Sequence, residues 1–428
     1  MAIGHNTPVK ESRFAKLKPS LAAGGPFQLV AEYQRDKNIQ KVDLIIGAYR
    51  DDNGKPWPLP SVTEAKKNLK IESQTHEYLP LRGCPDFLKA ARQLIFGPKI
   101  TEQYDASIAS IQTVSGTGAN SLIAAFLQRH SAPTNIWLPN PTWPNHPDIW
   151  QEHAPGMTIK HYPYYRAATH SFDFTGMIDT LNTQAQDGDA ILLHACAHNP
   201  TGLDPSKEQW KTIASIASKK RLFVIFDLAY QGFASGNLDL DAWAVRYFCT
   251  QHRGLEMAVC QSFSKTLGLY GERTGALHVV SSRDGPSSTT LRTAATVEEH
   301  LVNIHRATVS MAPRFGSQVA TEILGSAELQ EKWKADLAAM SGRIAEMRRA
   351  LYDGLVRLKT PGNWEHIIQQ TGMFSYTGLS NEEVALLKKE FSVYLLPSGR
   401  ASICGLTVKN VGYTAEAIHR VVLASRGK

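Results

Sequence analysis

The sequence has few cysteines, no long uninterrupted apolar stretch and no cluster of basic residues. Its five cysteines, in 428 residues, form no CxxC pair. They therefore fit neither a disulfide framework nor a zinc site, and they favour a reducing compartment. No segment approaches the roughly 20 apolar residues that a membrane helix needs. We therefore expect no membrane span and no metal site.

Basic residues are dispersed along the chain, although the formal net charge is +7. Nucleic-acid-binding proteins usually carry a clustered basic stripe, so we expect no nucleic-acid partner. A modest positive surface can instead steer small anionic substrates. The first 20 residues lack the apolar core of a secretory signal, and with Glu11 among their basic residues they match a mitochondrial peptide only weakly. The expected location is cytoplasmic.

The middle of the chain alternates short apolar runs with amphipathic segments. Strands are predicted at residues 106–114, 134–139, 189–197, 221–227 and 256–264. Because turns rich in glycine or proline bound them and helices separate them, the pattern predicts an α/β fold with a mostly parallel sheet covered by helices.

The pattern changes near residue 335. A long amphipathic helix is followed by three predicted strands and a closing helix, which is typical of a smaller α+β domain. We predict a large domain at 57–334, a small domain made of 27–56 and 335–428, and an N-terminal arm or flap at 1–26.

Four segments at predicted strand ends carry distinctive polar residues, and ligands of open α/β sheets bind at such ends. Ser115-Gly116-Thr117-Gly118 opens a helix, where glycine and free N–H groups suit an anion. Asn199-Pro200-Thr201-Gly202 follows another strand. Taken singly, each segment could be an ordinary turn before a helix.

The other two segments carry a carboxylate and a lysine. Asp227 ends an apolar strand, where it could cap a helix or pair with a buried cation. Lys265 lies between two serines and Arg273, where it could be a solvated turn residue. An aldehyde cofactor with a phosphate tail would require all four segments together. Such a cofactor needs a reactive lysine, a carboxylate for its ring nitrogen, and hydroxyls with an arginine for its phosphate.

The order SGTG, NPTG, DLAYQGFASG, SFSKTLGLYGERTG and a late SGR resembles the aspartate aminotransferase family, class I aminotransferases of pyridoxal-phosphate fold type I. The similarity begins near residue 27, reaches the C-terminus and is greatest with eukaryotic members. It implies a seven-stranded type of sheet, the cofactor pyridoxal 5′-phosphate and a homodimer with shared active sites. The implied reaction is ping-pong transfer of an amino group from aspartate or a related amino acid to a 2-oxo acid such as 2-oxoglutarate, through aldimine and ketimine forms.

The resemblance also implies roles for residues. Lys265 would hold the cofactor and move the proton, and Asp227 would bind the ring nitrogen with His194 behind it. Asn199 and Tyr230 would bind the 3′-oxygen, and Trp143 would stack on the ring. The phosphate would be bound by Ser115, Gly116, Thr117, Ser262, Ser264, Arg273 and, from the second subunit, Tyr78.

On the substrate side, the resemblance implies that Arg400 and the amide of Gly47 bind the α-carboxylate. Trp143 and Asn199 would also contact the substrate. Arg306 of the second subunit would bind a side-chain carboxylate. His146 and His198 are interpreted as packing or supporting residues.

Three departures from the family pattern lie near the substrate entrance. The apolar flap is replaced by the small residues Ala22 to Gly25, Ile45 stands where glycine is usual, and Met311 replaces a polar amide. They suggest a shift toward a bulkier amino acid. A lyase or carbon–carbon-bond-forming enzyme on the same scaffold and a non-catalytic protein remain alternatives.

Overall fold

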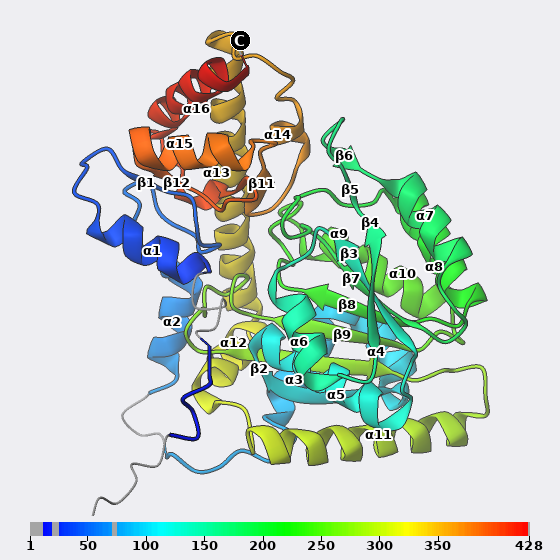
Figure 1. The fold of residues 1–428 in the computed structure, drawn as a ribbon. Helices are drawn as coiled ribbons and strands as arrows, with labels where there is room; N and C mark the ends of the chain where they lie inside the picture. Colours follow the sequence, from blue (N-terminus) through cyan, green and yellow to red (C-terminus); the bar gives the residue numbers. More distant parts are fainter. Residues whose placement is uncertain (1–11, 19–24, 71–74, 427–428) are drawn as a thin grey trace, which may run out of the picture.

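A computed structural model describes residues 12–18, 25–70 and 75–426. It has the predicted α/β architecture: a seven-stranded sheet lies among helices, and a smaller unit stands beside it (Figure 1). The strands are, in order across the sheet, β2 (Ile108–Val114), β10 (Thr274–Val280), β9 (Met257–Ser262), β8 (Phe223–Leu228), β7 (Ala190–His194), β3 (Asn135–Asn140) and β4 (Thr158–Pro163). Of these strands only β10 runs antiparallel to its neighbours.

Both faces of the sheet are buried, which explains the continuous apolar runs in its strands. Along β8, Val224 and Phe226 belong to one core, while Ile225 belongs to the other. Core residues on one face come from α5 (Ser115–His130), α6 (Asn145–His153) and α11 (Ser287–Thr308). The opposite face is covered by α3 (Pro85–Phe96), α7 (Phe174–Thr183), α8 (Lys207–Lys219), α10 (Trp243–Gln251) and α12 (Arg314–Gly325).

Shorter elements connect these layers. They are α2 (Pro60–Asn68), α4 (Pro98–Tyr104), a 3-10 turn at Asp105–Ser107, β5 (Tyr165–Arg166), β6 (Ser171–Phe172) and α9 (Leu238–Asp241).

The smaller unit joins segments far apart in sequence. Strand β1 (Val42–Asp43) pairs in parallel with β12 (Val393–Tyr394), and β11 (Phe374–Tyr376) pairs antiparallel with β13 (Arg400–Ser402). Its helices are α1 (Pro26–Arg35), α14 (His366–Gln369), α15 (Asn381–Phe391) and α16 (Val411–Arg426). The strand predicted at 401–408 ends at Ser402, because the chain turns into a 3-10 helix at Ile403–Gly405. There Gly405 passes so close to Asp43 that an added Cβ would lie 1.8 Å from the Asp43 carbonyl oxygen.

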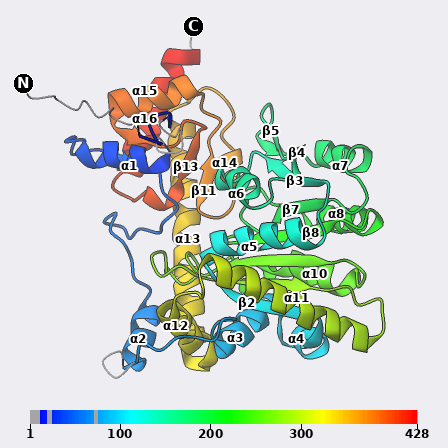
Figure 2. The same cartoon turned by 60° about the horizontal axis from the view of Figure 1, so that its bottom comes forward.

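Helix α13 (Ala327–Arg357) runs from α12 into the smaller unit, where it packs on α16 (Figures 1 and 2). Its 31 residues correspond to about 46 Å. It begins at the N-cap Ser326, eight residues before the start expected from periodicity alone. The predicted division between residues 334 and 335 therefore falls inside a continuous helix. That division stays a prediction, as does the arm at 1–26, of which residues 1–11 and 19–24 lie outside the described ranges.

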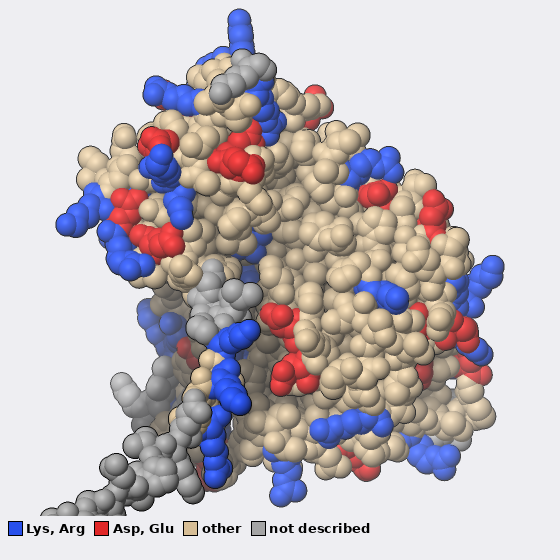
Figure 3. All heavy atoms as spheres, in the orientation of Figure 1, with Lys and Arg blue, Asp and Glu red and all other residues tan. Residues whose placement is uncertain are grey.

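Lysine and arginine side chains alternate with acidic ones over the face shown in Figure 3. Among the described residues, no helix combines the length and the apolar character that crossing a bilayer requires.

Candidate active site

A cavity of about 140 Å³ opens where β7, β8 and β9 end and α5 begins. Eleven of the predicted site residues line it: Ser115, Gly116, Thr117, Trp143, His194, Asn199, Asp227, Tyr230, Ser262, Lys265 and Arg273. Cys196 and Ala229 complete the wall and were not predicted. The fold thus brings the four motifs to one edge of the sheet, as expected for strands whose carboxyl ends meet there.

One end of the cavity has the features of an anion site. The hydroxyl of Ser115 lies 3.1 Å from that of Ser262 and 2.9 Å from that of Ser264, so Ser264 supports the wall from behind. Gly116 packs against Ser262, because an added Cβ would lie 3.1 Å from the Cβ of Ser262. Gly116 belongs to the first turn of α5, whose backbone N–H groups have no acceptor within the helix. These N–H groups and the positive end of the helix favour a phosphate.

Arg273 provides the cation at this end. Its Nη1 donates to the Ser264 hydroxyl over 3.3 Å and to the carbonyl of Tyr270 over 3.1 Å. None of the ion pairs formed within the described ranges uses Arg273, so its guanidinium has no carboxylate partner there. An unpaired cation, three hydroxyls and a helix N-terminus together suit the phosphate tail of the predicted cofactor.

A carboxylate lies at the other end of the cavity. Oδ2 of Asp227 is 3.0 Å from Nε2 of His146, and Nδ1 of His146 is 2.8 Å from the hydroxyl of Thr142. Burial by itself would raise the pKa of Asp227. The hydrogen bond and charge of His146, together with the charge of Lys265, outweigh burial, so the pKa is lowered and the carboxylate stays ionised.

The contact with His146 refines the sequence interpretation. His194 was expected behind Asp227, whereas His146 makes the hydrogen bond to Asp227, and His194 lies beside both, with its ring centroid 5.2 Å from that of His146. Burial lowers the pKa of His194 to about 3, so this ring is neutral. The two residues of the Asp227–His146 pair are 81 positions apart, and no local spacing could reveal their contact.

Lys265 faces this carboxylate across the cavity. Burial lowers the pKa of its amine to about 8, with Asp227 opposing the shift and Arg273 and Arg400 adding to it. Its Nζ lies 5.4 Å from the centre of the Tyr230 ring. A lysine with this pKa is partly neutral near physiological pH, as a nucleophile that condenses with an aldehyde must be.

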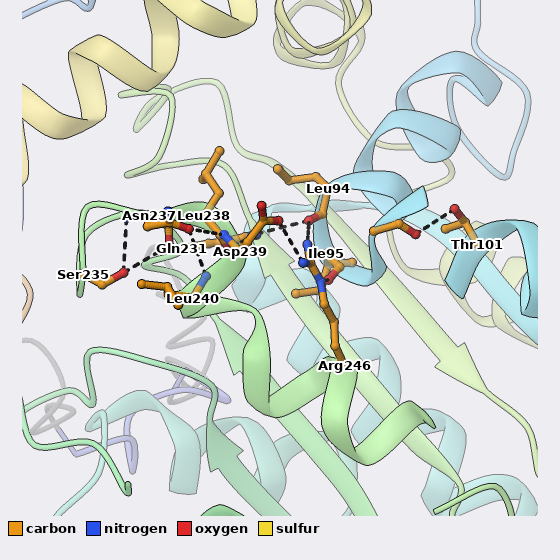
Figure 4. Close-up of polar contacts among 11 residues, drawn as sticks. Leu94, Ile95, Thr101, Gln231, Ser235, Asn237, Leu238, Asp239, Leu240 and Arg246 are labelled. Carbon is orange, nitrogen blue, oxygen red and sulfur yellow. Dashed lines mark hydrogen bonds and ion pairs between the residues drawn. The ribbon is translucent and has the colours of Figure 1, made fainter. Parts of the chain in front are cut away.

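The loops that carry Tyr230 and Lys265 are fixed from behind. Gln231 donates to the carbonyls of Leu94 and Leu238, and Arg246 donates to Leu94 and pairs with Asp239 (Figure 4). Gln231 attaches the segment after β8 directly to the end of α3, and Arg246 of α10 links Asp239 of that segment to the same end.

Trp333 of α13 attaches the lysine loop in the same way. Its indole N–H donates to the carbonyl of Thr266 over 2.6 Å, one residue after Lys265. The reactive amine is therefore held from the helix that enters the smaller unit.

Arg400 lies at the entrance to the cavity, on the side of the smaller unit. It is 6% exposed, donates to the carbonyl of Ile45 over 2.8 Å and reaches Oδ1 of Asn199 at 3.4 Å. Its guanidinium carbon lies 4.2 Å from the centre of the Phe374 ring. Burial lowers the pKa of Arg400 to about 10, which leaves it cationic at neutral pH. Gly47 lies beside the same ring, because an added Cβ would be 2.4 Å from its edge.

Tyr78 and Arg306 lie outside this cavity. Both are exposed, Tyr78 by 86%. Their predicted roles in a neighbouring subunit's site stay predictions. Met311 follows α11 and is half-buried, and Ile45 is fully buried with its carbonyl bound to Arg400. Of the predicted flap, Ala22, Ala23 and Gly24 lie outside the described residues.

Known proteins resemble this chain in sequence. Residues 39–418 match the family model described as aminotransferase class I and II. L-tyrosine:2-oxoglutarate aminotransferase of Aspergillus ustus is 49% identical, over 92% of this chain and 75% of that protein. Cytoplasmic aspartate aminotransferase of Schizosaccharomyces pombe is 44% identical, over 92% of this chain and 95% of that one.

The likeness extends to three dimensions. The structure of cytoplasmic aspartate aminotransferase from Saccharomyces cerevisiae superposes with a TM-score of 0.90 at 42% identity, and covers 96% of this chain and 98% of its own. The chain belongs to the aminotransferase class I and II family. More closely, it is a pyridoxal-phosphate-dependent enzyme of the aspartate aminotransferase type. The predicted transamination is confirmed, in preference to the lyase and non-catalytic alternatives.

Proposed function

We propose that this enzyme transfers the amino group of aspartate or a related amino acid to 2-oxoglutarate. The main supporting observation is Arg400, a buried cation that has no carboxylate partner within the described ranges and contacts Asn199 of the cavity wall. A guanidinium fork of this kind binds a carboxylate with two parallel hydrogen bonds. The relatives named above include enzymes for aspartate and for tyrosine with 2-oxoglutarate.

Charged residues of the chain would each have a separate role in the reaction. Bound pyridoxal phosphate supplies an electron sink for the pair of electrons released at the substrate Cα. Asp227, kept ionised by His146, would hold the ring nitrogen protonated. Ser115, Ser262 and Arg273 would bind the phosphate.

Lys265 would move the proton. Its amine is partly neutral near pH 8, so Nζ could accept the proton from the substrate Cα and donate it again. Tyr230 would donate from its hydroxyl, because burial raises the pKa of this phenol well above 10 and keeps it protonated. Arg400 and Asn199 would orient the substrate so that its Cα hydrogen faces Lys265.

We further propose a homodimer that shares its active sites. A second hollow, of about 420 Å³, borders the cofactor cavity, since Thr117 and Arg273 line both. Its remaining walls are mainly apolar and come from α5 and α11, with Leu122 and Ile304 among them. Both ring nitrogens of His305 are buried there without a partner among the described residues. A second subunit inserted here would bring its own exposed Tyr78 and Arg306 near the site.

The substrate assignment is tested with purified enzyme, a panel of amino acids and 2-oxoglutarate. Arg306→Ala should lower kcat/KM for aspartate by about a hundredfold, because the side-chain carboxylate loses a charged partner. It should change kcat/KM for tyrosine by less than about threefold, since tyrosine offers no second carboxylate. Equal losses for both substrates would refute the assignment of Arg306 to the side chain.

Sharing of the site is tested by subunit exchange. Lys265→Ala and Arg306→Ala dimers are each defective, but a hybrid would contain one complete site, formed by Lys265 of one subunit and Arg306 of the other. A mixture allowed to exchange should regain about a quarter of the wild-type rate with aspartate, because about half of the dimers would be hybrids. No regain would mean that both residues serve the site of their own chain.

A second candidate substrate class is the aromatic amino acids. Met311 and Ile45 are apolar residues where the family pattern has a polar amide and a glycine, and the Aspergillus relative is named for tyrosine. A kcat/KM for tyrosine equal to or above that for aspartate would favour this class. We also propose a cytoplasmic location, which the names of the two yeast relatives support.

A further inference from the structure

Arg348 is a buried arginine of α13 that the chemistry above does not use. Its side chain is 3% exposed. Nη1 donates to the carbonyl of Ile367 over 3.1 Å, and Nη2 contacts the carbonyls of Thr371 at 3.3 Å, Gly372 at 2.8 Å and Phe374. Among the ion pairs of the described residues, none uses Arg348, and burial lowers the pKa of its guanidinium to about 10. A cation held by carbonyl dipoles alone fixes the backbone that provides them.

That backbone is the loop at residues 370–374, which lies between two parts of the site. The N–H of Thr371 donates to the carbonyl of Gly202 over 2.7 Å, at the end of the loop that carries Asn199. Gly372 is packed so closely that an added Cβ would lie 2.5 Å from that of Ala197. The loop is thus fixed against the cofactor side of the cavity.

The other end of the loop reaches the substrate side. Phe374 begins β11, and its ring centre lies 4.2 Å from the guanidinium carbon of Arg400. In the ladder between β11 and β13, Phe374 pairs with Ser402 and Tyr376 pairs with Arg400. A shift of Phe374 would therefore move the flat surface on which the Arg400 guanidinium rests.

We propose that Arg348 is a positioning residue for the α-carboxylate of the substrate: it fixes the 370–374 loop, and through Phe374 it sets the orientation of Arg400. The planar guanidinium reaches four carbonyls at once, and an ammonium group cannot reproduce this geometry. The inference rests on the proposed function, which assigns the α-carboxylate to Arg400.

The test uses the holoenzyme and the half-reaction with aspartate alone, followed by the change in visible absorbance of the bound cofactor. Arg348→Lys keeps the charge but loses the fork. We expect the apparent Kd for aspartate to rise at least about tenfold, while the limiting rate at saturation changes less than about threefold. Arg349→Lys is the matched control, because Arg349 is the adjacent, exposed arginine, and its Kd should stay at the wild-type value.

A double-mutant cycle separates positioning from general damage. In an Arg400→Lys background, adding Arg348→Lys should raise Kd less than about twofold, because the group it orients is already altered. An equal rise in both backgrounds, or a fall in limiting rate with an unchanged Kd, would overturn the role of Arg348. Arg348→Gln provides a second variant, which removes the charge. A lower Kd in Arg348→Lys than in Arg348→Gln would show that the positive charge contributes to holding the loop.

The same set of variants tests the role of Arg400 and the role of Arg348 separately. If Arg400→Lys alone leaves Kd for aspartate unchanged, the proposed function of Arg400 fails. If Arg400→Lys raises Kd and Arg348→Lys does not, only the inference about Arg348 fails.

Discussion

The cofactor end and the substrate end of this site are built differently. At the cofactor end, hydroxyls, a carboxylate and a lysine from four strand ends meet within one chain, and most are hydrogen-bonded to one another. At the substrate end, Arg400 is in place, but the second predicted arginine, Arg306, is exposed on the surface of the same chain. The cofactor residues are therefore positioned by the sheet, whereas under the proposed function substrate choice would depend on the smaller unit and on a second subunit.

The largest expected effect breaks the cofactor end. Lys265→Ala should lower turnover by at least about 10⁴-fold, because it removes both the nucleophile and the proton carrier. Cofactor-free protein should melt no lower than wild type at pH 7, since burial disfavours the charged form of this amine. Steady-state rates and a thermal melt provide the two measurements. Retention of more than about one per cent of activity would contradict the assignment.

A smaller loss is expected when the charge at the opposite wall is removed. Asp227→Asn keeps the shape but loses the negative charge, so turnover should fall by about 10² to 10³-fold. His146→Gln should cost less, about tenfold, because Asp227 remains and loses one hydrogen-bond partner. Steady-state kinetics on the two variants would show this order. The reverse order would mean that His146, not Asp227, is the main electrostatic group.

The alkaline titration sharpens the comparison at the cofactor end. Lys265 has a folded-state pKa of about 8, below its ordinary 10.5, so between these values the unfolded chain binds more protons than the native one. Stability of the cofactor-free protein should therefore rise with pH through this window, by up to about 3 kcal/mol relative to Lys265→Met. Urea unfolding at pH 8 and pH 10 measures the difference. Parallel curves for both proteins would show that the amine is not perturbed.

In the smaller unit we expect a weaker pH dependence of stability, at acidic pH. His366 of α14 lies 4.4 Å, ring centre to ring centre, from His170, and burial with the charge of His170 lowers its pKa to about 4. Between pH 6.5 and 4 the unfolded state binds a proton at this histidine and the native state does not. The free energy of unfolding therefore decreases as the pH is lowered through this range. Relative to His366→Gln, wild type should lose about 2 kcal/mol in urea unfolding across that range. Equal losses would remove His366 as the cause.

The sequence predicted the site best where its residues belong to short local motifs. Asp227, Lys265 and the serines stand next to turns at strand ends, so the order of motifs along the chain was enough to predict the fold and the cofactor cavity. Groups that act over long sequence separations gave no signal. His146 was interpreted as a packing or supporting residue, and only its 3.0 Å contact in the structure shows that the group it supports is Asp227.

Arg348 is a second residue whose role could not be predicted from the sequence. Within EMRRALY it resembles any charged position of an amphipathic helix, and its exposed neighbour Arg349 has the same chemistry. Only the three-dimensional phase of α13 turns the first arginine inward and the second outward. Sequence periodicity also placed the start of this helix too late, although the buried Leu329 and Trp333 continue its apolar stripe into the turn that follows the Ser326 N-cap.

Helix α13 holds the lysine loop through Trp333 and the 370–374 loop through Arg348, fifteen residues further along. These two attachment points are separated by about 22 Å along a helix that turns about 100° per residue. One inserted residue between them would rotate Arg348 away from its carbonyls while leaving Trp333 in place. Seven inserted residues would nearly restore the rotation but add about 10 Å of length. In evolution, this stretch of the gene should therefore tolerate substitutions and exclude insertions and deletions of any size.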